Sequence, residues 1–365
     1  MSKLPTILHI STPKSWRGGE QQLAYLYEEL KQKGLTQYIL CRKNSAMAQK
    51  GKSKGWNIIE CRKTIAIDPF FARKVKLVCK QKKIDIVHAH DSHAHSFAVI
   101  SASLFSNKTP IVVSRRVDFA ISKTSIKKYN HANIKRILCV SDAIKNLTEP
   151  DIINKSILKT IHSGIDLTKF KLAKNRYEKL HKEYNIPDNI PIIGNVAAIA
   201  PHKDYFTFIN TAEELIKRNI KAKFFIIGTG PMEEEIKNYC AQKKLNKHII
   251  FTGFRTDIHE ILPEFDIFLI TSKTEGLGTS IIDAFACKVP VVATRAGGIP
   301  EIIQHEKSGL LAEVKDAKEL ANQVERILNG SFNKSKIIAE QQEVLKKFSK
   351  SVTAEKTLRE YLSIS

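Results

Sequence analysis

Residues 266–301 read DIFLITSKTEGLGTSIIDAFACKVPVVATRAGGIPE, and their order of apolar and polar runs predicts the fold. The apolar beginning predicts a strand, and a polar loop with Gly276 and Gly278 leads into a helical pattern from about Thr279. Residues 290–293 predict the next strand. A strand, a helix and a second strand joined by short loops are typical of a parallel α/β sheet.

Short apolar runs alternate with helical patterns along the rest of the chain. The first series of expected strands is 5–10, 36–41, 84–88, 110–114, 136–140 and 158–162, and the second is 191–198, 223–228, 248–252, 266–271 and 289–293. The expected helices include 20–33, which ends at Gly34, and also 204–218, 312–328 and 335–362. This alternation predicts an α/β protein with two Rossmann-like domains, each built on a parallel sheet.

A chain of 365 residues is too long for one ordinary hydrophobic core, which also predicts two domains. The charged, loop-like segment 167–190 separates the two series of strands. We therefore expect an N-terminal domain over 1–168 and a C-terminal domain over 169–347, with a helix at about 348–365 that packs back onto the first domain. Because such sheets bind ligands beyond the carboxyl ends of their strands, two facing domains would share a ligand-binding cleft.

The net charge of +22 is concentrated in the first half of the chain. Residues 1–170 contain 30 Lys and Arg against 12 Asp and Glu, a balance of +18, which leaves +4 for the remainder. Such a basic half attracts nucleic acid, an anionic membrane or an acidic substrate, and a solubilising lysine-rich surface would give the same count. No recognisable nucleic-acid-binding module interleaves aromatic residues with these lysines.

Several other classes of protein are disfavoured by the sequence. No apolar run approaches the roughly 20 residues that span a bilayer, and the first ten residues lack the zones of a signal peptide, so we expect a cytoplasmic protein. The six cysteines are scattered without a C-x-x-C pair, which argues against a zinc site or a disulfide framework. An NAD-dependent dehydrogenase is disfavoured because no G-x-G-x-x-G follows the first strand.

The loop of 275–279 has the features of an anion-binding site. Free backbone N–H groups and the positive end of the helix dipole favour phosphate at a helix start, and Gly276 and Gly278 let the backbone approach a ligand closely. Glu275, at the end of the strand, can accept hydrogen bonds from sugar hydroxyls, and Asp283, about one turn into the helix, can accept them from a ribose diol. A glycine loop by itself also fits a simple strand-to-helix turn.

This segment resembles the E-x7-E signature of the retaining GT-B glycosyltransferases of family four. Glu275 matches the first acidic position, and Asp283 stands where the family usually has the second Glu. Other similar motifs follow the family's order: RGGEQQL (17–23), VSDAIKN (140–146), IHSGIDLTKF (161–170), IIGTGP (226–231), FTGF (251–254), LPEFD (262–266) and PVVATRAGGIPEII (290–303).

The resemblance implies a nucleotide-sugar donor, UDP- or GDP-linked, bound mainly by the second domain. Glu275 would bind the transferred sugar, Asp283 the ribose, and the backbone from Gly276 to Thr279 the diphosphate or sugar, with Gly18 and Gly19 approaching the phosphates. The full set of expected donor-binding residues is Gly18, Gly19, His202, Lys203, Gly228, Phe254, Arg255, Glu275, Gly276, Leu277, Gly278, Thr279 and Asp283.

The chain departs from the family's pattern after the first strand of the second domain. The family usually has an Arg and a Lys there to neutralise the leaving diphosphate, whereas VAAIAPHKD (196–204) keeps Lys203 and has Ala198 at the arginine's place. His202 or Arg255 could supply the missing charge. We expect Lys203 and Glu275 to be the catalytic residues of this domain.

In the first domain, the resemblance points to Asp91 and Arg116 as catalytic or acceptor-side residues. IDIVHAHDSHAHS (84–96) packs four histidines, His88, His90, His93 and His95, into eight residues, and a metal site is one interpretation of that cluster. We expect no metal, because the family has similar strand ends without one and the chain has no plausible D-x-D motif. Arg116 or Arg115, in SRRVDF (114–119), stands where the family often has a cleft histidine and could hold an anionic acceptor or the sugar.

The expected function is metal-independent transfer of a sugar from a nucleotide sugar to an acceptor hydroxyl, with retention of configuration and without a cofactor. The acceptor would be a glycan or glycolipid of polysaccharide or lipopolysaccharide synthesis, met at the anionic inner face of the membrane. Phe70, Phe71, Val75, Leu77 and Val78 beside Arg73, Lys74 and Lys76 would form the interfacial helix. The alternatives are a GT-B epimerase or phosphorylase, and a basic nucleic-acid-binding protein.

Overall fold

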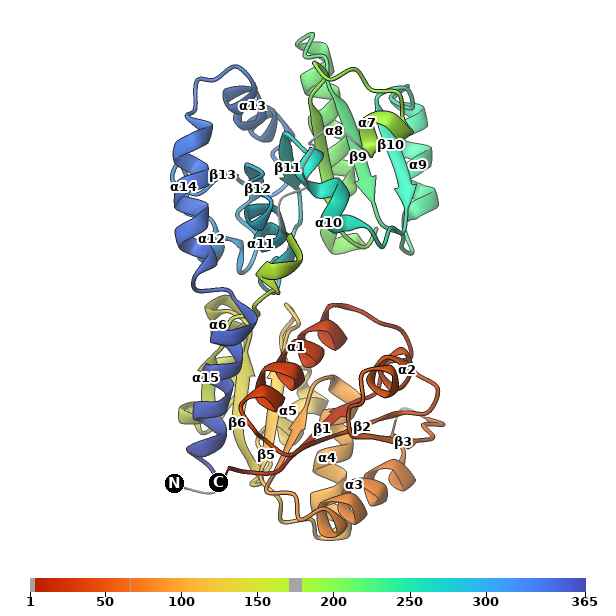
Figure 1. The fold of residues 1–365 in the computed structure, drawn as a ribbon, viewed down its shortest axis with the longest axis vertical. Coiled ribbons are helices and arrows are strands. Elements are labelled where there is room, and N and C mark those ends of the chain that lie inside the picture. The colour runs from red at the N-terminus through yellow and green to blue at the C-terminus, as the bar shows by residue number, and fades with distance from the viewer. Residues whose placement is uncertain (1–3, 66, 171–178) are drawn as a thin grey trace. The chain divides into compact units, whose positions relative to one another are not determined.

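The computed structural model describes residues 4–65, 67–170 and 179–365, and the chain divides into two units. The first unit consists of Met1–Gly164 together with Lys350–Ser365, and the second of Ile165–Ser349. Each unit contains a parallel sheet covered by helices, which confirms the predicted α/β class and the two Rossmann-like domains (Figure 1).

The first unit is built on a seven-stranded sheet in the order β3-β2-β1-β4-β5-β6-β7, with all neighbours parallel among the described residues. Its strands are β1 (Ile7–Ser11), β2 (Gln37–Arg42), β3 (Ile58–Cys61), β4 (Ile86–Ala89), β5 (Ile111–Arg115), β6 (Ile134–Cys139) and β7 (Leu158–Thr160). Its helices are α1 (Gly18–Gln32), α2 (Ala46–Ser53), α3 (Pro69–Gln81), α4 (Ser92–Phe105), α5 (Lys123–Tyr129), α6 (Asp142–Thr148) and α15 (Lys350–Leu362).

The second unit has a six-stranded parallel sheet in the order β10-β9-β8-β11-β12-β13 within the same described ranges. Its strands are β8 (Ile192–Val196), β9 (Lys223–Ile227), β10 (Ile249–Gly253), β11 (Ile267–Ile270), β12 (Val291–Thr294) and β13 (Leu310–Ala312). Its helices are α7 (Leu180–Glu183), α8 (Tyr205–Lys217), α9 (Glu233–Gln242), α10 (Ile258–Ile261), α11 (Thr279–Ala286), α12 (Ile299–Ile302), α13 (Ala317–Leu328) and α14 (Lys334–Leu345).

The central strands are buried along their whole length and mainly apolar, because helices cover both faces of each sheet. All five residues of β1 are buried, as are all four of β11 and of β12. Such continuous apolar runs are typical of parallel sheets, in contrast to the alternating pattern of half-exposed antiparallel strands. This explains why the central strands were predictable from the sequence.

The elements that the sequence did not predict are short or lie at the sheet edges. The residues of β3 are all half-buried, and β13 has three residues, so neither forms a clear apolar run. The single helix predicted over 335–362 is wrong: α14 and α15 are separate, and between them Phe348 O accepts a hydrogen bond from Ile165 N at 2.9 Å. No helix in the described part of the chain combines the length and hydrophobicity needed to cross a bilayer.

The order of strands in each sheet fixes where a ligand can bind. In the first unit the order reverses between the neighbours β1 and β4, and in the second unit between β8 and β11. At such a switch point the loops that follow the two strands leave toward opposite faces of the sheet and open a crevice. The loops after β1, β4, β8 and β11, together with the first residues of the helices that follow them, contain most of the residues selected from the sequence.

The C-terminal helix α15 belongs to the core of the first unit. Tyr361 is fully buried with Ile7, Ile86 and Val112, and α15 packs on α1. The Tyr361 hydroxyl lies 2.5 Å from Nδ1 of the buried His88, at the end of β4. The last turns of the chain therefore complete the hydrophobic core that begins with its first strand.

We expect Tyr361→Ala to destabilise the first unit by about 3–5 kcal/mol, since a buried aromatic ring is lost. Tyr361→Phe removes one buried hydrogen bond and should cost about 1 kcal/mol. Both tryptophans, Trp16 and Trp56, lie in this unit, so urea unfolding followed by tryptophan fluorescence measures it selectively. Leu362→Ala, at a position 41% exposed, is the matched control and should change little. Equal stability of Tyr361→Ala and the wild type would contradict this packing.

Candidate active site

Lys203 and Glu275 form an ion pair in the second unit, although 72 residues separate them in the sequence. Lys203 ends the short 3-10 turn that follows β8, and Glu275 lies in the loop that follows β11. Both side chains are largely buried, with 18% and 9% of their surfaces exposed. Glu275 also accepts a hydrogen bond from Ser272 Oγ at 2.9 Å. The structure therefore brings the two expected catalytic residues of this unit into direct contact at the switch point.

Hydrogen bonds to backbone carbonyls hold the two loops of this site together. Thr271 Oγ1 donates to the carbonyl oxygens of Lys203 and Asp204 at 3.2 and 3.0 Å. Lys273 N donates to His202 O at 2.8 Å, and Thr294 Oγ1 donates to Ser272 O at 2.6 Å. Thr271, Ser272 and Thr294 are buried, so these hydrogen bonds hold the loops in defined positions.

Three glycines permit close approach of backbones around the site. A Cβ on Gly297 would lie 2.0 Å from Glu275 O, and Gly298 N donates to the same oxygen at 3.0 Å. Gly228, with φ +140°, and Gly230 would likewise place a Cβ 2.0 and 2.2 Å from the carbonyl oxygens of residues 197 and 199. Sequence reasoning selected Gly228 as a ligand-binding residue but missed the positioning role of Gly297, which the RAGG motif could have indicated.

The helix α11 begins at Thr279, and the residue before it, Gly278, has a φ of +88°, a left-handed conformation that favours glycine. Glycine has no side chain to cap the helix, and no side-chain oxygen of the described residues caps this end. The first turn of α11 therefore offers backbone N–H groups and the positive end of its dipole to an anion. Leu277, just before it, is buried and anchors the loop.

Asp283 lies one turn into α11 and is partly accessible to solvent. Burial raises the pKa of its carboxyl to about 7, and the nearby charge of Lys169 lowers it by a smaller amount. A carboxyl with this pKa exchanges its proton near neutral pH, so it can change between a donor and an acceptor of hydrogen bonds.

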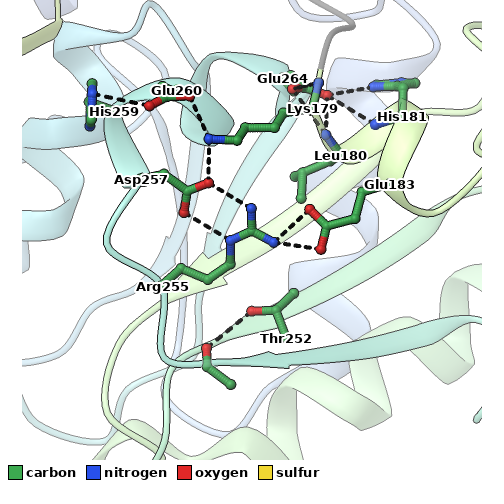
Figure 2. Close-up of polar contacts among 11 residues, drawn as sticks. Lys179, Leu180, His181, Glu183, Thr252, Arg255, Asp257, His259, Glu260 and Glu264 are labelled. Carbon is green, nitrogen blue, oxygen red and sulfur yellow. Dashed lines mark hydrogen bonds and ion pairs between the residues drawn. The ribbon is translucent and has the colours of Figure 1, made fainter.

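Arg255 is held by carboxylates of its own unit (Figure 2). Its guanidinium donates to Asp257 at 2.9 and 2.6 Å and to both oxygens of Glu183 at 2.7 and 2.8 Å. Lys179 joins this network through Asp257 at 2.7 Å, and the network lowers the pKa of Asp257. The positive charge of Arg255 is therefore already neutralised, whereas His202 is exposed beside Lys203.

Two further expected residues are exposed on the second unit. Phe254, just after β10, is 76% exposed, which is high for an aromatic side chain. Ala198, which stands where the family usually has an arginine, is exposed in the loop after β8. This position therefore contributes no positive charge.

In the first unit, Asp91 caps α4 and joins two loops. Its carboxylate accepts hydrogen bonds from Thr12 N and Thr12 Oγ1, both at 2.7 Å, and from the backbone N–H groups of His93 and Ala94 at 3.0 and 2.9 Å. Thr12 follows β1 and Asp91 follows β4, so this carboxylate ties together the two loops of the switch point. These bonds give Asp91 a positioning role, and its contact with an acceptor stays a prediction.

Gly18 and Gly19 begin α1 after β1. A Cβ at either position would meet no described atom within 4 Å, so packing within the chain does not require glycine there. The space beside both residues is open to a ligand.

The histidine cluster is linked by hydrogen bonds, and its members differ from those expected. His9, His88 and His90 are buried with ring nitrogens within 4.8 Å of one another, so three nitrogen ligands of a metal are present. However, His9 Nδ1 lies 2.9 Å from His90 Nε2, and His9 Nε2 lies 3.0 Å from Gln37 Oε1. Burial lowers the pKa of all three, to about 4 for His9, so they are neutral at physiological pH.

Within the predicted cluster, His93 is exposed on α4, while His95 is buried against Tyr129 with ring centroids 4.6 Å apart. The four histidines that are adjacent in sequence therefore separate into different environments. Of these four, only His88 and His90 belong to the buried group. Its third member, His9 of β1, was not suggested by the sequence.

The sequence did not decide whether Arg115 or Arg116 stands where the family often has a cleft histidine. The structure gives the two side chains different partners. Arg115 is 3% exposed, and its guanidinium donates to Thr148 Oγ1, the Tyr129 hydroxyl and Phe119 O, which makes it a structural link between β5 and the helices beside it. Arg116 donates to Ser163 Oγ at 3.1 Å and Ser114 Oγ at 3.4 Å. Arg116 also lines a pocket of about 330 Å³ with His90 and Asp91.

The proposed interfacial helix α3 is partly a core helix. Phe71, Val75 and Val78 are buried, which corrects the expectation that they contact a membrane. Leu77 of α3 is 41% exposed, and the more exposed apolar residues lie at the start of α3 and in the loop before it: Ile65, Ile67 and Phe70, at 60%, 63% and 80% exposure.

Comparisons with known proteins identify both halves of the chain. Residues 16–169 match the family described as Glycosyltransferase Family 4, and residues 176–347 match the family described as Glycosyl transferases group 1. Two curated relatives cover most of the chain. The N-acetyl-alpha-D-glucosaminyl L-malate synthase of Bacillus anthracis is 26% identical over 72% of this chain and 70% of its own. An Escherichia coli galactosyltransferase that acts on alpha-D-GlcNAc-diphosphoundecaprenol is 27% identical over 68% and 67%.

Solved structures show the same fold over almost the whole chain. A glycosyltransferase from Rickettsia africae has a TM-score of 0.86 at 22% identity and covers 99% of this chain and 98% of its own. Anabaena HepE in complex with UDP and glucose has a TM-score of 0.86 at 19% identity, with 98% and 99% coverage.

We expect Asp283→Asn to become more stable relative to the wild type as the pH rises. The raised pKa means that the folded protein keeps a proton on Asp283 that the unfolded chain has lost, so wild-type stability falls between about pH 4 and pH 7. Asparagine has no such proton. Calorimetric melting temperatures of both proteins at pH 5 and pH 8 test this prediction. Other titrating groups affect both proteins equally, so their contributions cancel when the melting temperature of the wild type is subtracted from that of the variant. A difference that is the same at both pH values would mean that Asp283 titrates normally.

Proposed function

Because the chain belongs to glycosyltransferase family 4 and has its GT-B fold, we propose that it transfers a sugar from a nucleotide sugar to a hydroxyl of an acceptor with retention of anomeric configuration. The observation that carries this proposal is the ion pair of Lys203 and Glu275 at the switch point of the second sheet. It places one cation and one hydrogen-bond acceptor beside the uncapped start of α11.

These groups suit the charges that develop during sugar transfer. When the bond from the anomeric carbon to the diphosphate oxygen breaks, negative charge grows on the diphosphate. Lys203 and the N–H groups at the start of α11 stabilise that charge where it appears, which lowers the barrier. The acceptor hydroxyl attacks from the same face, and its proton passes to the departing phosphate oxygen. This route needs neither a covalent enzyme intermediate nor a metal ion.

Binding of the donor releases Lys203 from Glu275. In the ligand-free protein each of these largely buried groups neutralises the other. The diphosphate replaces Glu275 as the partner of Lys203, and Glu275 then accepts hydrogen bonds from hydroxyls of the transferred sugar.

The other expected residues contact the rest of the donor. Asp283 binds the ribose diol, and the exposed ring of Phe254 is available to the nucleotide base. Gly18 and Gly19 leave room for the phosphates on the first unit, and His202 supplies a further donor beside Lys203. Arg255 stays in its carboxylate network.

The names of the relatives support an acceptor of the cell envelope or a small acid. One relative makes N-acetylglucosaminyl malate, one acts on a diphosphoundecaprenol-linked sugar, and one is a phosphatidylinositol monomannoside mannosyltransferase. The structure in complex with UDP supports a nucleotide-sugar donor. We assign the chain to cell-envelope glycan or glycolipid synthesis on the cytoplasmic side.

The basic first unit has a surface suited to an anionic membrane. The exposed Ile65, Ile67 and Phe70 lie beside a basic hollow of about 310 Å³. Its lining includes four cationic side chains, those of Arg42, Lys43, Arg62 and Lys63. Apolar side chains that insert among acyl chains and cations that bind headgroups are the two components of reversible membrane association. We propose that this surface brings the enzyme to a lipid-linked acceptor.

A binding panel of UDP-, GDP-, ADP- and TDP-sugars in EDTA tests the proposed function. At about 100-fold its dissociation constant, the cognate donor should stabilise the protein by roughly 2.7 kcal/mol, seen as a rise in melting temperature. Lys203→Ala and Glu275→Ala should each lower the rate of transfer by about 10²–10³-fold, because an electrostatic contact of the transition state is lost.

Lys273→Ala is the matched control, since Lys273 lies in the same loop but outside the ion pair, and its activity should stay near that of the wild type. Binding of no nucleotide sugar, or binding only with added Mg²⁺ or Mn²⁺, would contradict the proposal. Near-normal kcat/KM in Lys203→Ala would remove that residue from the mechanism.

We expect the wild type to sediment with vesicles that contain phosphatidylglycerol and to be released as salt is raised, since charge attraction is screened. Replacing Ile67 and Phe70 with Ser should weaken binding at every salt concentration, because these side chains are exposed and their loss does not disturb the core. Leu104→Ser, which alters an equally exposed apolar residue at the end of α4, is the control. Equal binding of both variants would exclude this surface from membrane contact.

A further inference from the structure

A pocket of about 330 Å³ lies wholly within the first unit, at the carboxyl ends of β1, β4 and β5. Its lining includes six charged side chains, of Arg17, Glu20, Asp91, Arg115, Arg116 and Lys128. Its volume is within the range of small-molecule sites. The remainder of the wall is largely apolar, with Val113, Phe119 and Ile121 among its residues.

The two carboxylates of this pocket are engaged with backbone and hydroxyl groups rather than with its cations. Asp91 accepts the four hydrogen bonds that cap α4 and bind Thr12. Glu20 is 5% exposed and accepts a hydrogen bond from Arg17 N at 3.0 Å, as the capping residue of α1. Among the residues that the structure describes, no carboxylate forms an ion pair with Arg115, Arg116 or Lys128.

Arg115 and Arg116 differ in how completely their guanidinium groups are bonded. Arg115 uses all three of its nitrogens in hydrogen bonds to neutral oxygens. Arg116 donates only to the hydroxyls of Ser163 and Ser114, and its Nε is buried with no hydrogen-bond partner among the described residues. Lys128 Nζ lies 3.3 Å from Ser96 Oγ, a neutral partner.

A buried cation without a counter-anion is energetically unfavourable. Arg116 is half-buried, and burial lowers its pKa to about 10 while the nearby charge of Glu20 raises it by a smaller amount. The group therefore keeps its positive charge at neutral pH but has no ion-pair partner among the described residues. A ligand that brings a negative charge would remove this deficit. The planar guanidinium suits phosphate or carboxylate, which it can bind through two parallel hydrogen bonds.

We propose that this pocket binds a phosphate or carboxylate group of the acceptor through Arg116, with Lys128 as the second cation. The proposal rests on the proposed glycosyltransferase function, of which it specifies the acceptor: an alcohol that carries an anionic group. The apolar wall holds the carbon skeleton. A soluble phosphate ester and an anionic lipid headgroup share this chemistry.

Inorganic phosphate is the simplest probe of the pocket. Unfolding of the first unit, followed by its two tryptophans, should shift to higher temperature with phosphate in the wild type and in Lys203→Ala. In Arg116→Gln, which keeps the polar shape without the charge, phosphate affinity should fall about 10-fold or more, as expected for loss of a charged hydrogen bond. The nucleotide sugar should show the opposite dependence, with weaker binding to Lys203→Ala and unchanged binding to Arg116→Gln.

Two variants on α5 provide a second test and its matched control. Lys128→Gln should weaken phosphate binding, whereas Lys127→Gln should not, because Lys127 is exposed on the same helix and outside the pocket. Arg116→Lys should recover part of the affinity, which excludes a purely structural effect of the substitution. If Arg116→Gln does not fold, Lys128→Gln and Lys127→Gln decide the test by themselves.

Two further probes distinguish the sources of the anion. Binding of sn-glycerol 3-phosphate that depends on Arg116, without binding of glycerol, indicates a soluble acceptor. Arg116-dependent binding of phosphatidylglycerol vesicles, compared with phosphatidylcholine vesicles, indicates a lipid headgroup. Phosphate affinity that is equal in the wild type, Arg116→Gln and Lys128→Gln overturns the proposal, while a failure of every nucleotide sugar to bind overturns the glycosyltransferase function instead.

Discussion

The parallel pairing of strands that are distant in sequence is the constraint on which both sites depend. β8 pairs directly with β11, and β1 with β4, so the loops after these strands meet at one edge of each sheet. Without the first pairing, Lys203 and Glu275 could not form an ion pair across 72 residues. Without the second, Asp91 could not bind Thr12 and fix the loop that leads into α1. The central strands therefore determine the positions of the charged groups that surround them.

The cations of the two sites have different partners. In the second unit, Lys203 pairs with Glu275, and Arg255 is held by Asp257 and Glu183. In the first unit, Arg115 and Arg116 are bonded to neutral oxygens. A paired cation must exchange partners to bind an anion, whereas an unpaired one gains a partner on binding. This difference suits the proposed roles of a donor site whose cation exchanges partners and an acceptor site whose cation gains one.

The loops of the second site are positioned largely by small residues and hydroxyl groups. Thr271 and Thr294 bind backbone carbonyls, and Gly297 lets its chain lie directly against Glu275 O. Such contacts hold an ionic group in place without bringing additional charge into the site. They also fix the loops before a ligand arrives, which is the condition for electrostatic catalysis.

The sequence by itself determined the fold class, the central strands and the family, because buried parallel strands are mainly apolar and the motifs around the glycine loop before α11 resemble those of the family. It also led to the prediction of Lys203, Glu275, Asp283 and Arg116 as site residues. Only the tertiary structure decided which charged side chains are free of an ion-pair partner and so available to a ligand. The partner of a side chain depends on strands and loops that come together from distant parts of the chain. Thus Arg255 is neutralised by Glu183, His9 joins the buried histidines from β1, and Phe71 lies in the core. Arg115 and Arg116 are neighbours in the sequence, yet all three guanidinium nitrogens of Arg115 are hydrogen-bonded, whereas Nε of Arg116, which follows the end of β5, has no partner among the described residues.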